Sequence, residues 1–148
     1  MVIAFVVTLG LTLYMTGMIW SMQILEYPLF ALVGPKEFPT YHGRHNRGLP
    51  VFVILPSVAA LVSAVVLIFT RPAHLSQWSP FVVAALDLVV VVVTAGREAP
   101  LHAKLDREGY SQPVIRQLVQ GNWIRTMLWT ANGLLLLALT VQLIGTAN

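Results

Sequence analysis

Apolar residues form four long blocks along the chain, and most polar residues lie between them. The blocks cover residues 2–25, 49–70, 80–96 and 123–145. A helix of about 20 such residues is long enough to cross the roughly 30 Å of hydrocarbon in a bilayer. The alternation of apolar and polar residues that marks barrel strands is absent from the sequence. The pattern therefore predicts an all-α fold, a four-transmembrane-helix bundle, as a single integral membrane domain over residues 1–148.

The composition supports an integral membrane protein. Hydrophobic residues make up 57% of the 148 residues and charged residues 10%, whereas soluble domains carry about 25% charged residues. The chain contains no cysteine, which excludes disulfides, thiolate zinc sites and thiol catalysis. We do not expect the first block to be a cleaved signal, because it lacks a basic start and is longer than the apolar core of a signal peptide.

The basic residues predict the orientation of the bundle. The net charge is +3, and the connection between the second and third blocks carries a single cation, Arg71. The other two connections and the start of the fourth block carry the remaining cations: Lys36, Arg44, Arg47, Arg97, Lys104, Arg107, Arg116 and Arg125. Cytoplasmic loops are enriched in Lys and Arg, so we expect those connections in the cytoplasm of a bacterial inner membrane or an equivalent membrane, with both termini outside. Because membrane orientation accounts for the basic residues, we do not expect nucleic acid as a partner.

Both basic connections contain signs of further helix. Residues 35–46 are predicted to form a short helix that leads into the second span. At Ser111-Gln112-Pro113, Ser111 is a candidate N-cap and Pro113 falls in the first turn, where proline is tolerated. We therefore expect short interfacial helices in these connections, the second with an apolar face of Val114, Ile115 and Leu118.

The ends of the first and third spans carry the same motif. Residues 26–31 read Glu-Tyr-Pro-Leu-Phe-Ala and residues 98–103 read Glu-Ala-Pro-Leu-His-Ala, so both follow the pattern E-x-P-L-x-A. One interpretation is an internal repeat, a duplicated two-helix hairpin related by an axis along the membrane normal. A repeat makes Glu26 and Glu98 symmetry mates that face each other across the bundle. The other interpretation is chance, aided by the frequency of proline near helix ends.

Histidines and carboxylates are predicted to gather on the cytoplasmic side. His42 and His45 are three residues apart, which puts them on one face of a helix. The candidate metal ligands are His42, His45, His102, Glu26 and Glu98. A transition metal, namely iron, copper, manganese or zinc, suits imidazole and carboxylate ligands. Asp106 is a candidate to orient His102 from behind.

A second interpretation of these residues needs no metal. In it, His42 and His45 are solvated among the lipid headgroups, and the two glutamates form salt bridges with Arg125 and Arg97. A haem is less favoured than a metal ion, because no histidine falls within a predicted span.

One acidic residue, Asp87, falls inside a predicted span. A carboxylate at mid-membrane costs about 2.5–3.5 kcal/mol on insertion, so Asp87 is expected to face the bundle interior. Asp87 and Asn132 lie equally far from the inner ends of their spans, so they share a depth and a hydrogen bond is predicted. Candidates to join them are Thr16, Ser57 and Thr130. Such a cluster is either a packing contact or a proton site at the floor of a substrate cavity.

Three short motifs give the chain a family resemblance. They are Tyr41-His42-Gly43-Arg44-His45 before the second span, Ala99-Pro100-Leu101-His102 at the end of the third, and Trp123-Ile124-Arg125-Thr126 at the start of the fourth. In these motifs and in its four spans, the chain resembles the anthrone-oxygenase-like family of small membrane proteins. Where many relatives are expected to carry asparagine, this chain has His102, which adds a candidate ligand. The resemblance implies oxidation of a hydrophobic aromatic compound by dioxygen.

We therefore expect a membrane-embedded oxidoreductase or oxygenase that acts on a lipophilic, aromatic small molecule taken from the lipid bilayer. The candidate catalytic residues are Glu26, Glu98 and Arg125, and the candidate substrate-binding residues are Tyr41, Trp123, Trp129, Asp87 and Asn132. The alternative is a non-enzymatic transporter subunit or assembly factor with Asp87 as its intramembrane polar centre. A homo-oligomer that packs through the small residues of the first two spans is left open.

Overall fold

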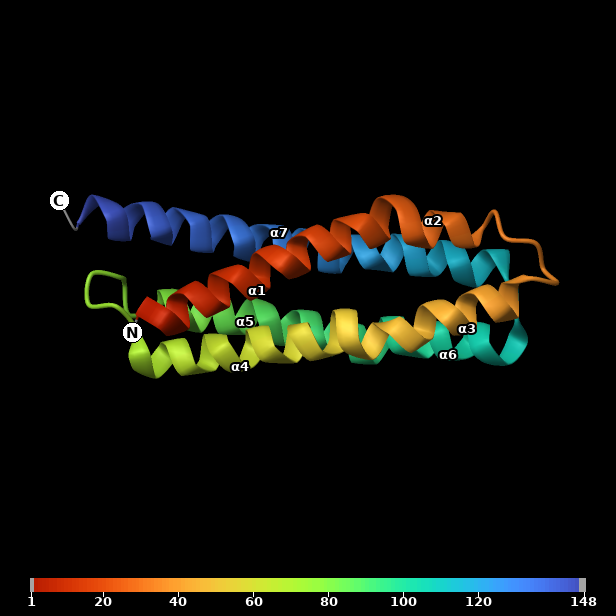
Figure 1. Cartoon of the computed structure of the whole chain (residues 1–148), viewed down its shortest axis with the longest axis horizontal. Coiled ribbons are helices and arrows are strands. Elements are labelled where there is room, and N and C mark those ends of the chain that lie inside the picture. Colours follow the sequence, from red (N-terminus) through yellow and green to blue (C-terminus); the bar gives the residue numbers. More distant parts are fainter. Residues whose placement is uncertain (1, 147–148) are drawn as a thin grey trace.

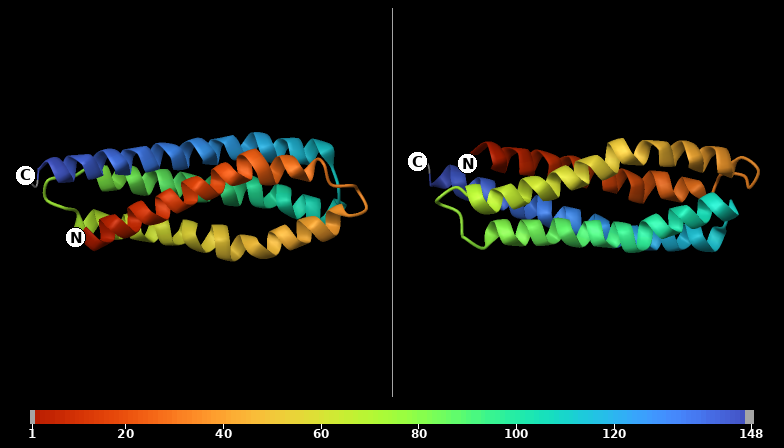
Figure 2. Two further views of the ribbon diagram at one scale, coloured as in Figure 1. Left: turned by 45° about the horizontal axis from the view of Figure 1, so that its top comes forward. Right: turned by 90° about the horizontal axis from the view of Figure 1, so that it is seen from below.

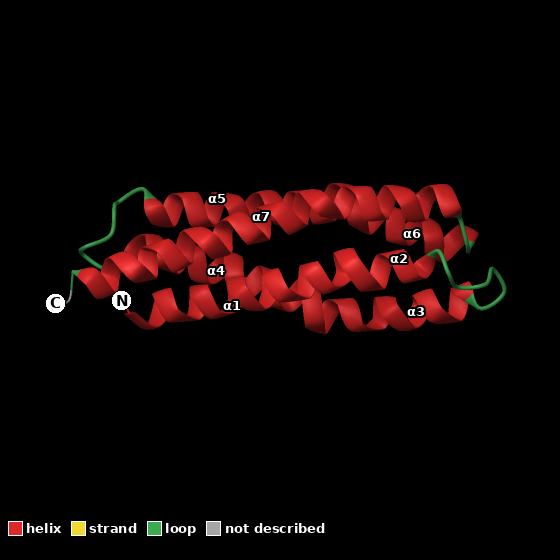
Figure 3. Cartoon of the chain, turned by 90° about the horizontal axis from the view of Figure 1, so that it is seen from above, coloured by secondary structure: helices red, strands yellow, loops and turns green. Residues whose placement is uncertain are grey.

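The computed structural model describes residues 2–146, which form four long helices and, within that range, no strand (Figure 3). The first helix consists of α1 (Val2–Ser21), a π-helical turn η1 (Met22–Glu26) and α2 (Tyr27–Phe30). The second consists of α3 (Phe38–Leu49), η2 (Pro50–Ile54) and α4 (Leu55–Thr70). The third consists of α5 (Ser79–Val93), η3 (Thr94–Glu98) and α6 (Ala99–Glu108), and the fourth is α7 (Gln112–Gly145). The predicted all-α fold is confirmed, since each of these helices is long and apolar enough to cross a membrane.

The four helices pack as an antiparallel up-down-up-down bundle. α1 contacts α4 and α7, and α5 also contacts α4 and α7, so each helix lies between two neighbours. Both termini and the connection over residues 71–78 lie at one end of the bundle (Figure 1). The connections over residues 31–37 and 109–111 lie at the other end, which we call the polar end (Figure 2).

Each helix is longer than the hydrocarbon of a membrane is thick. The four helices contain 29, 33, 30 and 34 residues, or about 44–51 Å at 1.5 Å per residue, against about 30 Å of hydrocarbon. The surplus lies at the polar end, where α3 and α6 carry charged residues. The helices expected in the two basic connections are therefore present, and α3, α6 and the start of α7 continue the spans directly.

Three of the four helices contain a π-helical turn just before a proline. In these turns the backbone N–H groups of Tyr27, Leu55 and Ala99 donate to carbonyls five residues earlier, those of Met22, Pro50 and Thr94. The next residues are Pro28, Pro56 and Pro100. Proline has no N–H, and its ring collides with the carbonyl four residues earlier. The wider π turn relieves that conflict, and such turns are frequent at functional sites.

The two E-x-P-L-x-A motifs have the same local structure. In each, the glutamate ends the π turn and the proline is the second residue of the following α-helix. A duplicated hairpin requires this agreement, but proline produces the same kind of turn before Pro56, outside the motif. The internal repeat therefore stays a prediction.

The interior of the polar end is packed with apolar side chains. Phe30, Phe38 and Leu105 belong to a buried cluster there, together with the start of α7. The predicted apolar face of α7 is confirmed, because Val114, Ile115 and Leu118 are buried. The helix begins directly after Ser111, as predicted; the backbone of Ser111 is extended, and its side chain makes no capping hydrogen bond.

Candidate functional site

Three histidines form a stack inside the polar end. α3 supplies His42 and His45, and α6 supplies His102. The ring planes of His42 and His102 are inclined by 16° with centroids 5.2 Å apart, and those of His45 and His102 by 17° with centroids 5.7 Å apart. The ring of Phe30 packs edge-on against all three. The prediction that these histidines gather at one end of the bundle is confirmed.

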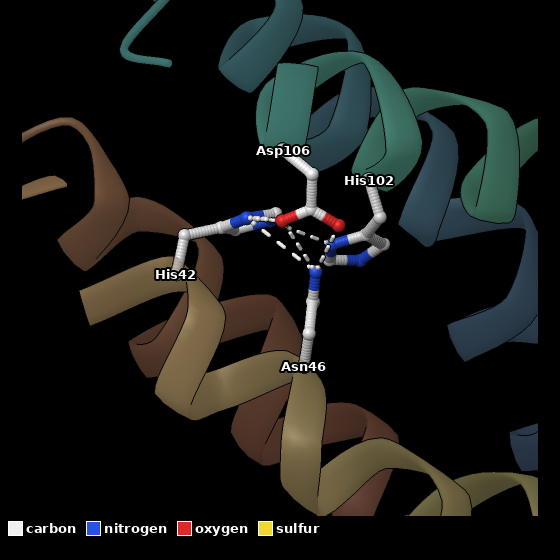
Figure 4. Close-up of polar contacts among 4 residues, drawn as sticks. All are labelled: His42, Asn46, His102 and Asp106. Atoms are coloured by element: carbon white, nitrogen blue, oxygen red, sulfur yellow. Dashed lines mark hydrogen bonds and ion pairs between the residues drawn. The ribbon is translucent and has the colours of Figure 1, made fainter. Parts of the chain in front are cut away.

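A chain of hydrogen bonds runs through two of these histidines (Figure 4). The first bond joins Oδ1 of Asp106 to Nδ1 of His42 at 2.8 Å. The second joins Nε2 of His42 to Nδ1 of His102 at 3.0 Å. The third joins Nε2 of His102 to the hydroxyl of Tyr27 at 3.2 Å. We call these four residues, Asp106, His42, His102 and Tyr27, the relay; they come from the first, second and third helices.

The carboxylate of Asp106 sets the direction of every bond in the relay. Nδ2 of Asn46 donates to both oxygens of Asp106, at 3.0 and 2.9 Å, so both carboxylate oxygens act as acceptors. His42 then donates from Nδ1 and accepts at Nε2. His102 likewise donates from Nδ1, and its Nε2 accepts from the Tyr27 hydroxyl. With Asp106 as the acceptor and both rings neutral, each histidine is assigned as the Nδ1–H tautomer. In that arrangement, a shift of each proton by one bond carries a proton from Tyr27 to Asp106.

The relay leads from solvent into the interior. The side chain of Asp106 is 50% exposed, whereas that of His42 is 1% exposed. Tyr27 and His102 are also buried. The outer end of the relay therefore exchanges protons with water while its inner end is shielded from it.

Both ends of the relay, Tyr27 and Asp106, line a cavity between the second and third helices, which we call the relay cavity. Its volume is about 260 Å³. Its wall contains Tyr27, Asn46, His102 and Asp106 among apolar residues that include Leu49, Val53, Ile54 and Ala99. A largely apolar wall with a few convergent polar groups is typical of sites for small molecules.

Two buried charged side chains also line the relay cavity. Glu98 is 1% exposed and Arg125 is 3% exposed. Both carboxylate oxygens of Glu98 and Nε of Arg125 lack a hydrogen-bond partner among the described residues. Nε of Arg97 lies 3.8 Å from Oε1 of Glu98, close enough for an ion pair and too far for a hydrogen bond. Because buried polar groups are nearly always satisfied, these atoms are suited to bind a ligand in the relay cavity.

Gly121 of α7 makes room for Glu98. A Cβ atom at this position would lie 2.6 Å from Oε1 of Glu98 and would also collide with Nε of Arg97. Small residues allow helices in membranes to approach closely. The glycine therefore lets Glu98 remain inside the bundle beside the relay cavity.

An apolar groove continues from the relay cavity along the bundle. The groove has a volume of about 230 Å³ and shares Val53, Ile54, Thr94 and Ala99 with the cavity wall. Its other lining residues are Ser57, Val58, Val91 and Ala95, which lie in α4, α5 and η3. The two spaces thus follow one seam between the second and third helices, from the apolar spans to the relay.

Glu26 and His45 lie beside a different cavity. It has a volume of about 290 Å³ and lies between the first and second helices, with Met18, Met22 and Phe52 in its wall. Nδ1 of His45 is 3.5 Å from Oε2 of Glu26, and Nε2 of His45 has no hydrogen-bond partner among the described residues. The two glutamates of the repeated motif therefore line separate cavities, and neither cavity contains both.

The five predicted metal ligands are divided between these cavities and the relay. Within residues 2–146, no group of three or more His, Cys, Asp or Glu side chains is arranged to hold a metal ion. Two ring nitrogens that a metal would need, Nε2 of His42 and Nδ1 of His102, are bonded to each other. A metal centre stays a prediction.

Asp106 contacts a different histidine from the one expected. The sequence places it four residues after His102 as an orienting group, but its bond is to His42. The two residues of α6 point toward α3, so the ring of His42 lies between them and bridges them. Asp106 therefore acts on His102 only through His42.

The five predicted substrate-binding residues do not line the relay cavity. Tyr41 packs against Phe30. Trp123 is 44% exposed and packs edge-on against Trp20, as suits an aromatic residue at the membrane edge. Trp129 is buried in the core. A substrate-binding role for these residues stays a prediction.

Asp87 and Asn132 form the predicted hydrogen bond in the middle of the bundle. Nδ2 of Asn132 donates to Oδ1 of Asp87 at 2.8 Å, and both residues are buried. Neither lines any cavity described above. The residues expected to join them, Thr16, Ser57 and Thr130, do not do so. Their hydroxyls donate to carbonyls four residues earlier in their own helices, which satisfies them locally.

Sequence reasoning missed two residues of the site, Tyr27 and Asn46. Asn46 follows His42 by four residues, and Asp106 follows His102 by four, so each pair shares a helix face. That matched spacing on two polar helix segments was a usable signal for a facing polar cluster. Tyr27 gave no comparable signal, because its contact with His102 depends on how the first and third helices pack.

No family model, no curated protein and no solved structure matches this chain. The resemblance to the anthrone-oxygenase-like family therefore rests on the three short motifs in the sequence. Function is inferred from the residues of the site.

Proposed function

We propose that this membrane protein is an oxidoreductase that acts on a lipophilic, aromatic small molecule in the relay cavity. The observation that carries the proposal is the relay itself. It joins a half-exposed carboxylate, Asp106, to the hydroxyl of Tyr27 in the cavity wall through bonds of 2.8, 3.0 and 3.2 Å. A packing contact does not need a chain of hydrogen bonds from an exposed carboxylate to a hydroxyl in a cavity wall, whereas acid–base chemistry needs groups within hydrogen-bond reach of the proton that they move.

In the proposed reaction, the relay removes a proton from the substrate. The acidic group of the substrate donates to Tyr27 while the tyrosine proton passes to His102. His102 then passes its Nδ1 proton to His42, which passes its own to Asp106 at the surface. The proton leaves to water, and the substrate is left as an electron-rich anion. Dioxygen then adds to a ring carbon of this anion, the adduct takes a proton back as a hydroperoxide, and loss of water leaves a quinone, so that one phenol and one dioxygen become one quinone and one water.

Arg125 and Glu98 are proposed to hold the substrate during this step. The guanidinium of Arg125 is buried beside the relay cavity with a free Nε, so it favours an anionic oxygen on the substrate. The unpartnered carboxyl group of Glu98 offers a second polar contact. The apolar remainder of the cavity wall accepts the apolar body of the substrate.

The substrate is proposed to arrive from the bilayer. The groove lined by Val58 and Val91 runs from the spans to the relay cavity, and the spans expose many apolar side chains. A lipophilic molecule can follow this seam without crossing water. The clustering of cations at the polar end supports the orientation in which this end faces the cytoplasm, of a bacterial inner membrane or an equivalent membrane, with both termini outside.

Dioxygen uptake tests the proposal. The purified protein in lipid nanodiscs is given a lipophilic phenol, such as a hydroxynaphthalene, and in parallel its methyl ether, which has no acidic hydroxyl. We expect protein-dependent uptake with the phenol alone, lost in His102→Ala and kept in His74→Ala, a matched change at the other end of the bundle. Absence of uptake across hydroxylated aromatics, or equal uptake by the two variants, contradicts the proposal.

Metal analysis decides whether a metal takes part. The proposed proton transfer uses no metal, because the predicted ligands are not arranged to hold one. The purified protein is analysed for iron, copper, manganese and zinc beside a variant without His42, His45 and His102. A near-stoichiometric amount of one metal that is lost in the variant would show that these residues form a metal centre and not a relay. A protein that turns over without metal supports the relay.

The non-enzymatic alternative rests on Asp87. Asp87 accepts one hydrogen bond from Asn132, and Oδ2 of Asp87 and Oδ1 of Asn132 have no partner among the described residues. Because no described cavity adjoins the pair, a packing role is favoured. A transporter subunit or assembly factor built around Asp87 predicts that Asp87→Asn abolishes function while relay variants do not, which is the reverse of our expectation.

A further inference from the structure

A basic groove lies between the third and fourth helices, on the far side of the third helix from the relay cavity. It has a volume of about 580 Å³. The lining residues include three cations of the third helix, Arg97, Lys104 and Arg107, together with Leu101 and with Gln117 of α7. No acidic residue belongs to its wall.

The three cations act together on one face. Lys104 and Arg107 are three residues apart on α6, which makes them neighbours on the helix surface. The side chains of Arg97 and Lys104 are 46% and 47% exposed, so their charges are open to a ligand. Two acids offset part of this charge. Oε1 of Glu98 lies 3.8 Å from Nε of Arg97, and Glu108 approaches Lys104 to 3.9 Å in a pair that is about half exposed. Three cations face these two acids, so the groove keeps a net positive charge.

The groove lies at the depth of lipid headgroups. Arg97 directly follows the apolar block that ends at residue 96. Lys104 and Arg107 lie about 10 and 15 Å further from the hydrocarbon, at 1.5 Å per residue. On the membrane side, Val92 and Ile124 are 60% and 44% exposed, and Ile124 lies seven residues after Gln117, on the same face of α7. Apolar surface thus adjoins the basic groove where acyl chains would lie.

We propose that this groove is a binding site for an anionic phospholipid, with its phosphate on Arg97, Lys104 and Arg107 and its acyl chains along Val92 and Ile124. Basic pockets between transmembrane helices at the headgroup level bind such lipids through their phosphates. Both halves of the ligand match what the groove offers, whereas a free phosphate uses only its charged half. The proposal is independent of the function proposed for the relay cavity.

The chain provides a matched control for charge. Arg44 and Arg47 are exposed on α3, at the same end of the bundle, and they line none of the cavities described above. The double variants Lys104→Gln/Arg107→Gln and Arg44→Gln/Arg47→Gln each remove two positive charges. Only the first removes them from the groove.

Native mass spectrometry of the detergent-purified protein tests the proposal with phosphatidylglycerol and phosphatidylcholine as probes. We expect the protein to retain phosphatidylglycerol in preference to phosphatidylcholine. The groove variant should bind phosphatidylglycerol about tenfold or more weakly, and the Arg44/Arg47 variant should bind it as the unchanged protein does. A circular dichroism spectrum of each variant checks that it is folded.

Three outcomes overturn the proposal. One is equal binding of the two lipids. Another is an equal loss in the two double variants, which would show a response to overall charge. The third is displacement of phosphatidylglycerol by inorganic phosphate at similar concentration, which would identify a free phosphate site without a role for the acyl chains.

Discussion

Two buried polar groups in this bundle show what separates a packing contact from a candidate active site. In the middle of the bundle, Asn132 donates to Asp87 at 2.8 Å. At the polar end, the relay links Asp106, His42, His102 and Tyr27. Both groups are hydrogen-bonded between helices. Only the relay lines a described cavity, and it includes a carboxylate, that of Asp106, which is half exposed to solvent.

Burial of a charged residue alone is therefore a weak indication of function. Asp87 is the only acidic residue within the four apolar blocks, and it attracts attention for that reason. Its partner satisfies one oxygen and the other has no partner among the described residues, but neither residue lines a described cavity where a ligand could use that oxygen. The relay cavity, in contrast, brings the free carboxylate of Glu98 and the free Nε of Arg125 next to a proton path.

The largest expected effect comes from cutting the relay at its inner end. Tyr27→Phe removes one hydroxyl and keeps the ring that packs against Phe30. General acid–base catalysis contributes about 10²–10⁴-fold to rates, so we expect uptake of dioxygen with a lipophilic phenol to fall by about a hundredfold or more. The measurement is the initial rate in nanodiscs.

Asp87→Asn is the matched change in the middle of the bundle. It keeps the oxygen that accepts from Asn132 and removes only the ability to ionise. We expect the rate to stay within about twofold. If Asp87→Asn lowers the rate more than Tyr27→Phe does, the roles assigned to the two groups are reversed.

A smaller effect is expected at the outer end of the relay. Asp106→Asn keeps an oxygen that can accept from His42 but cannot take up its proton. Because this position is 50% exposed, water can replace the carboxylate in part, and we expect the rate to fall by roughly tenfold. An unchanged rate over the whole pH range would show that protons leave the cavity by another route.

Gly121→Ala should disturb the site through packing. The added Cβ would meet Oε1 of Glu98 at 2.6 Å and would collide with Arg97, and overpacking of this kind costs about 1–3 kcal/mol. We expect a lower thermal midpoint and weaker binding of the phenol. Gly17→Ala is the control, because a Cβ at Gly17 meets nothing within 4 Å; equal midpoints for the two variants would contradict the tight fit around Glu98.

The smallest effect is expected for Asn132→Leu, which removes the hydrogen bond to Asp87 and keeps a similar volume. Interhelical hydrogen bonds in membranes contribute about 0.6 kcal/mol on average and about 1.7 kcal/mol at most. We expect the free energy of unfolding in detergent to decrease by an amount in that range, and the uptake rate to stay unchanged. A loss of activity with unchanged stability would assign the pair a chemical role.

Much of the fold was predictable because its causes are local in the sequence. Four apolar blocks fixed four spans, Ser111 and Pro113 marked the start of α7, and helix arithmetic placed Asp87 opposite Asn132. The π turns were less visible. Each proline predicts a local break in the hydrogen bonds of its helix. That the helix adapts by forming a wider π turn before the proline is not visible in the sequence.

The site was predictable in composition and less so in connectivity. The histidines were expected together, and they stack. Which side-chain atoms form hydrogen bonds depends on how α3 and α6 approach each other. That approach is set by side-chain packing across the bundle. For the same reason the contact of Tyr27 with His102 had no signature in the sequence, and Trp123 and Trp129 were assigned to a pocket that they do not line.

Nitrogen-15 NMR of histidine-labelled protein shows whether the relay is a directed chain of neutral imidazoles. His42→Gln and His102→Gln variants assign the ring signals. We expect both rings to be neutral Nδ1–H tautomers, with a coupling across the hydrogen bond between Nε2 of His42 and Nδ1 of His102. Nε2–H tautomers, doubly protonated rings at neutral pH, or freely exchanging rings without that coupling would contradict this directed chain.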